Sequence, residues 1–172
     1  MPREVPAWAW WLAGGALVAG VVVVMTRRRA PGGTPLVYHR ERAAGVDARL
    51  LAFLDWWEVH GAFPLVVADK GGRRTSEAEQ AALYARGVTK ARTLAETPHG
   101  RGGALDLVPY DVERRVGLYE GPGVAAQYAA MGAAAKAQGL VWGGDWTSIK
   151  DMPHVEVADW RRLPMPSGGT ST

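Results

Sequence analysis

Two polar clusters about fifty residues apart constrain this chain most, because their side chains suit one chemistry only if the fold brings them together. The first cluster is a glycine-rich stretch, Pro98–Asp106, which contains His99 and Asp106. The second is the segment Asp151–His154. Two imidazoles and one carboxylate make a three-ligand zinc site that keeps a fourth position open. We therefore predict a metal centre formed by His99, Asp106 and His154.

The alternation of residue types around these positions predicts how they meet. Successive side chains of a strand point to opposite faces. In Ala104–Pro109 the carboxylate of Asp106 faces away from the neighbouring leucines, and in His154–Val157 the imidazole and Glu156 face away from the valines. Antiparallel pairing of these strands would bring Asp106 and His154 together on the open face of a sheet. His99 would then reach in from the preceding loop, which its glycines allow to bend tightly.

Helical and strand-like patterns are mixed along the rest of the chain. Apolar residues at spacings of three and four predict a helix from about Val46 to Gly61. Ser76 and Glu79 resemble a capping box for a helix that Gly87 closes. The remaining expected elements are strands at 63–68, 104–109 and 155–157 and an Ala-rich helix at 124–138, which is followed by a short apolar stretch at 140–142. This order predicts an α+β fold, with a small antiparallel sheet and packed helices around the zinc site.

The N-terminal residues predict a membrane helix ahead of this domain. Ala7–Met25 carries no charge, and about twenty helical residues span the ~30 Å hydrocarbon core. We assign residues 1–29 to this transmembrane helix and its flanks, and 30–45 to a Pro/Gly linker. Residues 46–163 form the zinc domain, and 164–172 a disordered tail. A cleaved signal peptide is the rival interpretation, but the positive charges follow the apolar run instead of preceding it.

The orientation of this predicted single-pass anchor is left open by the sequence. Arg27, Arg28 and Arg29 follow the helix, whereas only Arg3 precedes it, and the positive-inside rule then places the domain in the cytoplasm. The function argued below favours the cell-wall side.

Composition narrows the possible chemistry. The chain has no cysteine, so disulfides, thiolate zinc sites and cysteine nucleophiles are excluded. A formal net charge of +3 is too weak to indicate nucleic acid as a partner.

Two histidines and a carboxylate also suit non-haem iron, whereas calcium and magnesium prefer oxygen ligands alone. The neighbouring Asp151 favours zinc hydrolysis, because a carboxylate near the metal can transfer protons.

Other charged residues have simpler interpretations. Arg73 and Arg74 precede the Ser76 helix, and either is a candidate to stabilise an oxyanion. His39 and His60 are interpreted as polar surface, and Asp145 is as consistent with a turn as with a function. Arg101 and Glu156 are expected to be solvated or to support the metal ligands.

A family resemblance connects these motifs. His99-x-x-Gly102-x-Ala104-x-Asp106 resembles the HxxGxAxD motif of the zinc D-Ala-D-Ala carboxypeptidase/dipeptidase and L-alanyl-D-glutamate endopeptidase superfamily, and Asp151-x-x-His154 resembles its second motif. The stretches 142–154, 74–80 and 83–89 are most similar to the phage endolysin branch. The resemblance covers about residues 46–157. Pro98 departs from the small residue common before the first histidine, and an N-terminal membrane helix is not part of the common form.

The resemblance implies zinc on His99, Asp106 and His154, with Asp151 as general base and Arg74 stabilising the oxyanion. It further implies a peptidase that hydrolyses peptidoglycan stem peptides, with the bond between L-Ala and D-Glu as the expected target. A D-Ala-D-Ala carboxypeptidase is the alternative within the class. A non-catalytic zinc-fold binding module and a membrane-anchored structural protein are alternatives from other classes.

Overall fold

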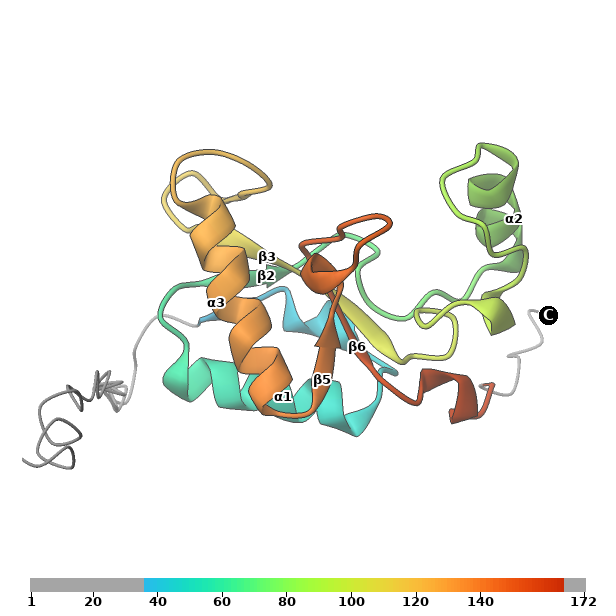
Figure 1. Ribbon diagram of the computed structural model, residues 1–172, viewed down its shortest axis with the longest axis horizontal. Coiled ribbons are helices and arrows are strands. Elements are labelled where there is room, and N and C mark those ends of the chain that lie inside the picture. Colours follow the sequence, from blue (N-terminus) through green and yellow to red (C-terminus); the bar gives the residue numbers. More distant parts are fainter. Residues whose placement is uncertain (1–35, 166–172) are drawn as a thin grey trace, which may run out of the picture.

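The computed structural model describes residues 36–165 (Figure 1). The predicted membrane helix at 7–25 and most of the predicted tail lie outside that range, so both stay predictions. Within residues 36–165, no helix combines the length and the apolar composition needed to cross a membrane.

Three α-helices and a small sheet make up the described domain, which confirms the α+β prediction. The helices are α1 (Ala48–His60), α2 (Glu77–Ala85) and α3 (Val124–Ala137). The strands are β1 (Val37–Tyr38), β2 (Leu65–Val67), β3 (Ala104–Asp111), β4 (Val116–Gly117), β5 (Leu140–Trp142) and β6 (His154–Val157). Short 3-10 helices lie at Arg40–Ala43, Leu94–Glu96, Gly143–Asp145 and Trp160–Arg162.

The sheet is mixed, which corrects the prediction of a purely antiparallel one. Its order is β1-β2-β3-β6-β5, with β4 paired to β3 off this path. β1 runs parallel to β2, whereas the other pairs are antiparallel. A parallel pair needs a long crossover connection, and α1 supplies it here. The Glu58 carboxylate of α1 also fixes the start of β1 by accepting hydrogen bonds from the backbone N–H groups of Leu36, at 2.8 Å, and Val37, at 2.9 Å.

Residues 36–45, the described part of the segment 30–45 that composition assigned to a linker, contain a strand and a 3-10 helix. Val37 is buried at 4 % exposure in β1, and Ala43 is buried at the end of the first 3-10 helix. A two-residue strand has too few residues to show a period, so no alternation in the sequence marks it.

The two faces of the sheet differ in chemistry, as the strand alternation predicted. α1 and α3 cover one face, and α2 lies to one side, away from both (Figure 1). Leu105, Leu107 and Val155 are fully buried in the apolar core. Asp106 and His154, at alternate positions of β3 and β6, belong to the other face. The apolar core thus gives the polar face a rigid support.

The N-cap predicted at Ser76 is present in α2, and Asp47 caps α1 in the same way. Asp47 accepts a hydrogen bond from Arg49 N at 2.9 Å, and Ser76 Oγ accepts one from Glu79 N at 3.2 Å. The Glu79 carboxylate does not complete a reciprocal capping box, because it pairs with Lys70. That pair connects α2 to the loop that carries Arg73 and Arg74.

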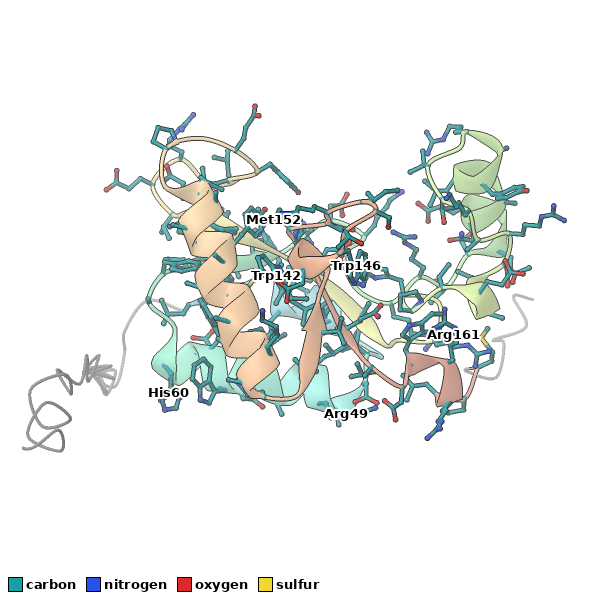
Figure 2. All side chains as sticks on the ribbon, in the orientation of Figure 1. Arg49, His60, Trp142, Trp146, Met152 and Arg161 are labelled. Carbon is teal, nitrogen blue, oxygen red and sulfur yellow. The ribbon has the colours of Figure 1, made fainter. Side chains whose placement is uncertain are left out.

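Helix α3 packs closely on β5 through a glycine. A Cβ added at Gly132 would lie 2.1 Å from the Trp142 ring, so only glycine fits there. The indole Nε1 of Trp142 donates a hydrogen bond to the Met152 carbonyl at 2.8 Å, next to Asp151. Figure 2 shows Trp142 between α3 and the loop that carries Met152. This contact therefore supports one wall of the site.

We expect Gly132→Ala to lower the free energy of unfolding by about 1–3 kcal/mol, because the added methyl group overpacks the contact with Trp142. The direction of the change tests the packing, because Gly→Ala at an unhindered helix position instead raises the free energy of unfolding by roughly 0.5–1 kcal/mol. Urea denaturation measures the change. Ala133→Leu on the exposed side of α3 is the control, with an expected change within about 0.5 kcal/mol. A Gly132→Ala protein as stable as the parent would contradict the packing described.

Candidate metal centre and its cleft

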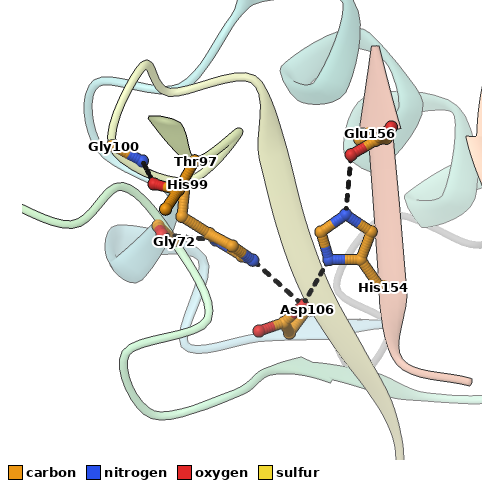
Figure 3. Close-up of polar contacts among 7 residues, drawn as sticks. All are labelled: Gly72, Thr97, His99, Gly100, Asp106, His154 and Glu156. Atoms are coloured by element: carbon orange, nitrogen blue, oxygen red, sulfur yellow. Dashed lines mark hydrogen bonds and ion pairs between the residues drawn. The ribbon is translucent and has the colours of Figure 1, made fainter. Parts of the chain in front are cut away.

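The three predicted metal ligands come together in the structure. Asp106 and His154 are direct partners across the antiparallel β3–β6 pair. His99 reaches them from the loop before β3, and the ligand atoms of all three residues lie within 4.8 Å of one another (Figure 3). One oxygen of Asp106 lies 3.3 Å from His99 Nε2 and 3.1 Å from His154 Nδ1. These three donors therefore face a common point.

The loop around His99 holds its imidazole in one orientation. Its Nδ1 lies 2.9 Å from the carbonyl oxygen of Gly72, and His99 is 5 % exposed. A carbonyl only accepts hydrogen bonds, so Nδ1 carries the proton and Nε2 is left with a lone pair. Thr97 Oγ1 accepts from Gly100 N at 2.8 Å, and a Cβ at Gly100 would lie 2.1 Å from the Leu94 carbonyl oxygen. The glycine therefore allows the close turn that aims His99.

His154 is held in the same manner by a different partner. Its Nε2 lies 3.0 Å from Glu156 Oε2, two positions along β6 on the same face. An ionised carboxylate only accepts, so Nε2 carries a proton, and Nδ1 faces Asp106, where it can bind a metal once it has lost its own proton. Sequence reasoning left Glu156 among the solvated or supporting residues. The sequence signal for this role is the spacing of Glu156 two positions after His154 in a strand, which places both side chains on one face.

This donor set fits a zinc ion. Two imidazole nitrogens and one carboxylate oxygen are ligands that zinc prefers. Each imidazole donates its other N–H to an oxygen, and such partners fix the tautomer and orient metal-binding histidines. His99, Asp106 and His154 would hold the ion, with Gly72 and Glu156 as the outer partners.

The electrostatics of the group reflect two carboxylates around a buried imidazole. Burial opposes ionisation of Asp106, but the adjacent imidazoles of His154 and His99 outweigh it, so its pKa lies far below the usual value. Burial also lowers the pKa of His154, whereas hydrogen bonds with Asp106 and Glu156 raise it more, to about 9. The protein without metal therefore keeps a proton on His154 at neutral pH.

Asp151 lies on the loop between β5 and β6, beside the ligands. Its backbone N–H donates to the Gly143 carbonyl at 3.1 Å, and its carbonyl accepts from His154 N at 3.2 Å. A Cβ at Gly143 would lie 2.5 Å from the Asp151 carbonyl oxygen, so the glycine permits this close approach. Burial and the charge of Asp106 raise the pKa of Asp151, while His154, His99 and Arg74 oppose the rise. This carboxyl is therefore more basic than an ordinary aspartate.

The two neighbouring arginines lie in different surroundings. Arg74 lines the cleft that contains the metal ligands, and its backbone N–H donates to the His99 carbonyl at 3.1 Å. Arg73 lies against the glycines of the loop before α1, because a Cβ at Gly45 would lie 3.2 Å from its side chain. Arg73 is not among the residues that line the cleft. The geometry thus favours Arg74 for a role at the site.

The cleft has a volume of about 550 Å³. Leu83, Val88, Thr89 and Lys90 form the wall on the α2 side, and Trp146 and Asp151 belong to the opposite wall. The Trp146 ring lies 5.0 Å from the His154 ring, centre to centre. The metal ligands therefore lie between two walls with room for an extended peptide.

Other polar residues singled out in the sequence have structural contacts. Asp145 pairs with Lys136 at 2.6 Å, and His60 stacks on Trp56. His39 is partly exposed beside Glu41. Arg101 donates to the carbonyl oxygens of Ala95 and Leu163, which ties the last 3-10 helix to the His99 loop.

Comparisons with known proteins support the family resemblance. The sequence model of a peptidase family described as D-alanyl-D-alanine carboxypeptidase matches residues 90–157. The crystal structure of the L-Ala D-Glu endopeptidase ChiX from Serratia marcescens is similar to this chain, with a TM-score of 0.57 and 26% sequence identity. The match covers 71% of this chain and 89% of that one. Both results confirm the superfamily resemblance predicted from the motifs.

We expect zinc binding at pH 7.5 to release about one proton, because His154 is protonated below its pKa of about 9 and a metal binds only the neutral imidazole. Titration calorimetry of the metal-free protein in phosphate and in Tris measures this number from the difference in apparent enthalpy. Raising the pH above about 9 should abolish the release from His154. An apparent enthalpy equal in both buffers at pH 7.5 would contradict the charge state described.

Proposed function

We propose that this chain, a metallopeptidase of the D-Ala-D-Ala carboxypeptidase and L-Ala-D-Glu endopeptidase superfamily, hydrolyses the L-Ala–D-Glu bond of peptidoglycan stem peptides. The observation that carries the proposal is the convergence of His99, Asp106 and His154 in a cleft whose walls also hold Asp151 and Arg74. The likeness to the Serratia endopeptidase over most of both chains supports this choice of bond.

A zinc ion held by the three ligands would act as a Lewis acid toward the scissile carbonyl and acidify the attacking water. The protein's part is to fix the three donors. Gly72 and Glu156 hold the protons on His99 Nδ1 and His154 Nε2, so that the opposite nitrogens stay available. Because both histidines are almost fully buried, their rings have little freedom to leave this arrangement.

Asp151 moves the protons of the reaction. Its carboxylate accepts a proton from the attacking water, whose oxygen bonds to the carbonyl carbon of L-Ala. The same carboxyl then gives the proton to the D-Glu nitrogen as the C–N bond breaks, which leaves a new carboxylate and a new amine. The half-buried position that raises the pKa of Asp151 suits it to this task, because a stronger base accepts the proton more readily.

Arg74 faces the negative charge that develops on the carbonyl oxygen. A fixed guanidinium at such a position stabilises the oxyanion more than the neutral carbonyl, and so lowers the barrier. Arg74 is available for this role, since its side chain lines the cleft and its charge acts on Asp151 and Glu79 only through space.

A D-Ala-D-Ala carboxypeptidase is the second candidate, favoured by the description of the matching family model. The same ligands, base and arginine would serve it, since both reactions hydrolyse an amide next to a D-residue. The two candidates differ in the product, because the carboxypeptidase releases free D-Ala. Both require the domain to reach the cell wall, and we propose that orientation for the predicted anchor.

Purified protein loaded with zinc should release new D-Glu amino termini from isolated peptidoglycan, detected by labelling the termini and mass spectrometry of the fragments. Asp151→Asn should lower this turnover about 10²- to 10⁴-fold, the usual contribution of a general acid–base. Its bound zinc, measured by atomic absorption, should be unchanged. Free D-Ala as the product would instead establish the carboxypeptidase. Absence of both products, or full activity of Asp151→Asn, would overturn the hydrolytic proposal.

The adjacent arginines supply a matched pair of variants. Arg74→Met should lower kcat about 10²- to 10³-fold with a small change in KM, as expected for loss of one oxyanion partner. Arg73→Met should leave kcat within about twofold, and any effect should appear in thermal stability, since Arg73 packs against Gly45 and Gly102. Equal losses of kcat in the two variants would remove the assignment to Arg74.

A further inference from the structure

Lys90 lines the cleft and has no part in the steps described above. It belongs to the wall on the α2 side, in the same cavity as His99, Asp106 and His154. Arg92, two positions further along the chain, is engaged elsewhere, because it donates to the Tyr84 hydroxyl at 3.1 Å and lies over that ring. Within residues 36–165, no carboxylate lies within ion-pair distance of the Lys90 ammonium group.

The carboxylates nearest in the chain are occupied by other groups. Glu96, which also lines the cavity, accepts a hydrogen bond from Arg92 N at 2.7 Å. Glu77 accepts one from Leu94 N at 3.0 Å, and Glu79 pairs with Lys70. Lys90 therefore keeps its charge available for a group that enters the cleft.

The backbone on both sides of Lys90 is held in place. Val88 N donates to the Leu83 carbonyl at 3.0 Å, and Ala91 N donates to Thr89 Oγ1 at 3.2 Å. Gln80, fully buried in α2, donates from Nε2 to the Ala91 carbonyl at 2.8 Å. This hydrogen bond from a buried side chain fixes the backbone from which the Lys90 side chain extends. It does not hold the Lys90 ammonium group itself.

An anionic substrate needs a cation at this place. Asp106, Asp151 and Glu96 also line the cavity, so a carboxylate brought in with the substrate meets negative charge there. In the stem peptide, D-Glu is linked onward through its γ-carboxyl group, which leaves its α-carboxylate free. That carboxylate is bonded to the carbon that carries the scissile nitrogen, so it enters the cavity whenever the bond is in place for hydrolysis.

We propose that the Lys90 ammonium group binds the free α-carboxylate of the D-Glu residue and so selects stems in which this group is ionised. The proposal rests on the endopeptidase function above, and it identifies the α-carboxylate as the substrate group that the cleft recognises. Lys90 contacts the substrate next to the reacting amide, whereas Arg74 serves the carbonyl oxygen on the other side of the bond.

The test compares two synthetic stem peptides that differ only at D-Glu, one with the free α-carboxylate and one with the α-carboxamide. For the zinc-loaded full chain, the amide should raise KM roughly tenfold, the effect of one partly exposed charge-assisted hydrogen bond, with little change in kcat. Lys90→Met should raise KM by the same factor on the carboxylate peptide and change nothing on the amide. Lys90→Arg should retain most of the preference.

Arg86→Met is the matched control, because it removes an exposed positive charge near the end of α2 outside the cavity. It should leave the ratio of KM values for the two peptides unchanged. Circular dichroism of each variant verifies that the fold is retained.

The outcomes separate this inference from the function on which it rests. If the wild-type chain hydrolyses neither peptide at the L-Ala–D-Glu bond, the endopeptidase proposal fails. If it hydrolyses both with equal KM, or if Lys90→Met loses the same factor on both, the endopeptidase stands and the Lys90 assignment is overturned. A loss confined to kcat would also overturn it, because a binding contact present in the ground state acts on KM.

Discussion

The pairing of β3 with β6 is the interaction on which the site depends. Its register places Asp106 directly opposite His154, and a slip of one residue would turn one of the two toward the apolar core. Leu105, Leu107 and Val155 exclude that slip, because they are fully buried on the face that α1 and α3 cover. The hydrophobic effect on one side of the sheet thus sets the geometry of polar chemistry on the other.

The excess of carboxylate groups around His154 makes this site suited to a divalent cation. Asp106 and Glu156 contact the buried His154, and Asp151 lies close enough to interact with it through space, as does Arg74 with Asp151. Without a metal, this excess of negative charge is compensated by a proton on His154, which is why its pKa rises against the effect of burial. A divalent ion held by these ligands would replace that proton and complete the compensation. The Nε2 proton bonded to Glu156 stays in both states, so the ring need not turn when the metal binds.

The parts of this structure that the sequence predicted are those with a long or regular pattern. The alternation in 104–109 and 154–157 predicted β3, β6 and the shared face of their polar residues, and spacings of three and four predicted α1. β1 and β4 have two residues each, and the start of β1 is held by Glu58, more than twenty positions away, which accepts the backbone N–H groups of Leu36 and Val37. No local pattern carries that information. For Glu156 the sequence left solvation and support of the metal ligands as alternatives, and only the contact with His154 decides for the second. Lys90 was not singled out, because only the fold defines the cavity that it lines.

The site divides its tasks between rigid and looser parts of the chain. The metal ligands lie on or beside two core strands, where packing limits their motion, whereas Lys90 and Thr89 lie on a loop after α2, far from α1 and α3 (Figure 1). Bond hydrolysis requires donors fixed to within about half an ångström, and strands supply that precision better than loops. Recognition of a carboxylate tolerates more movement, because a lysine ammonium group reaches its partner through a flexible stem. The buried Gln80 serves both needs, since it holds the loop through the Ala91 carbonyl and does not engage the lysine side chain.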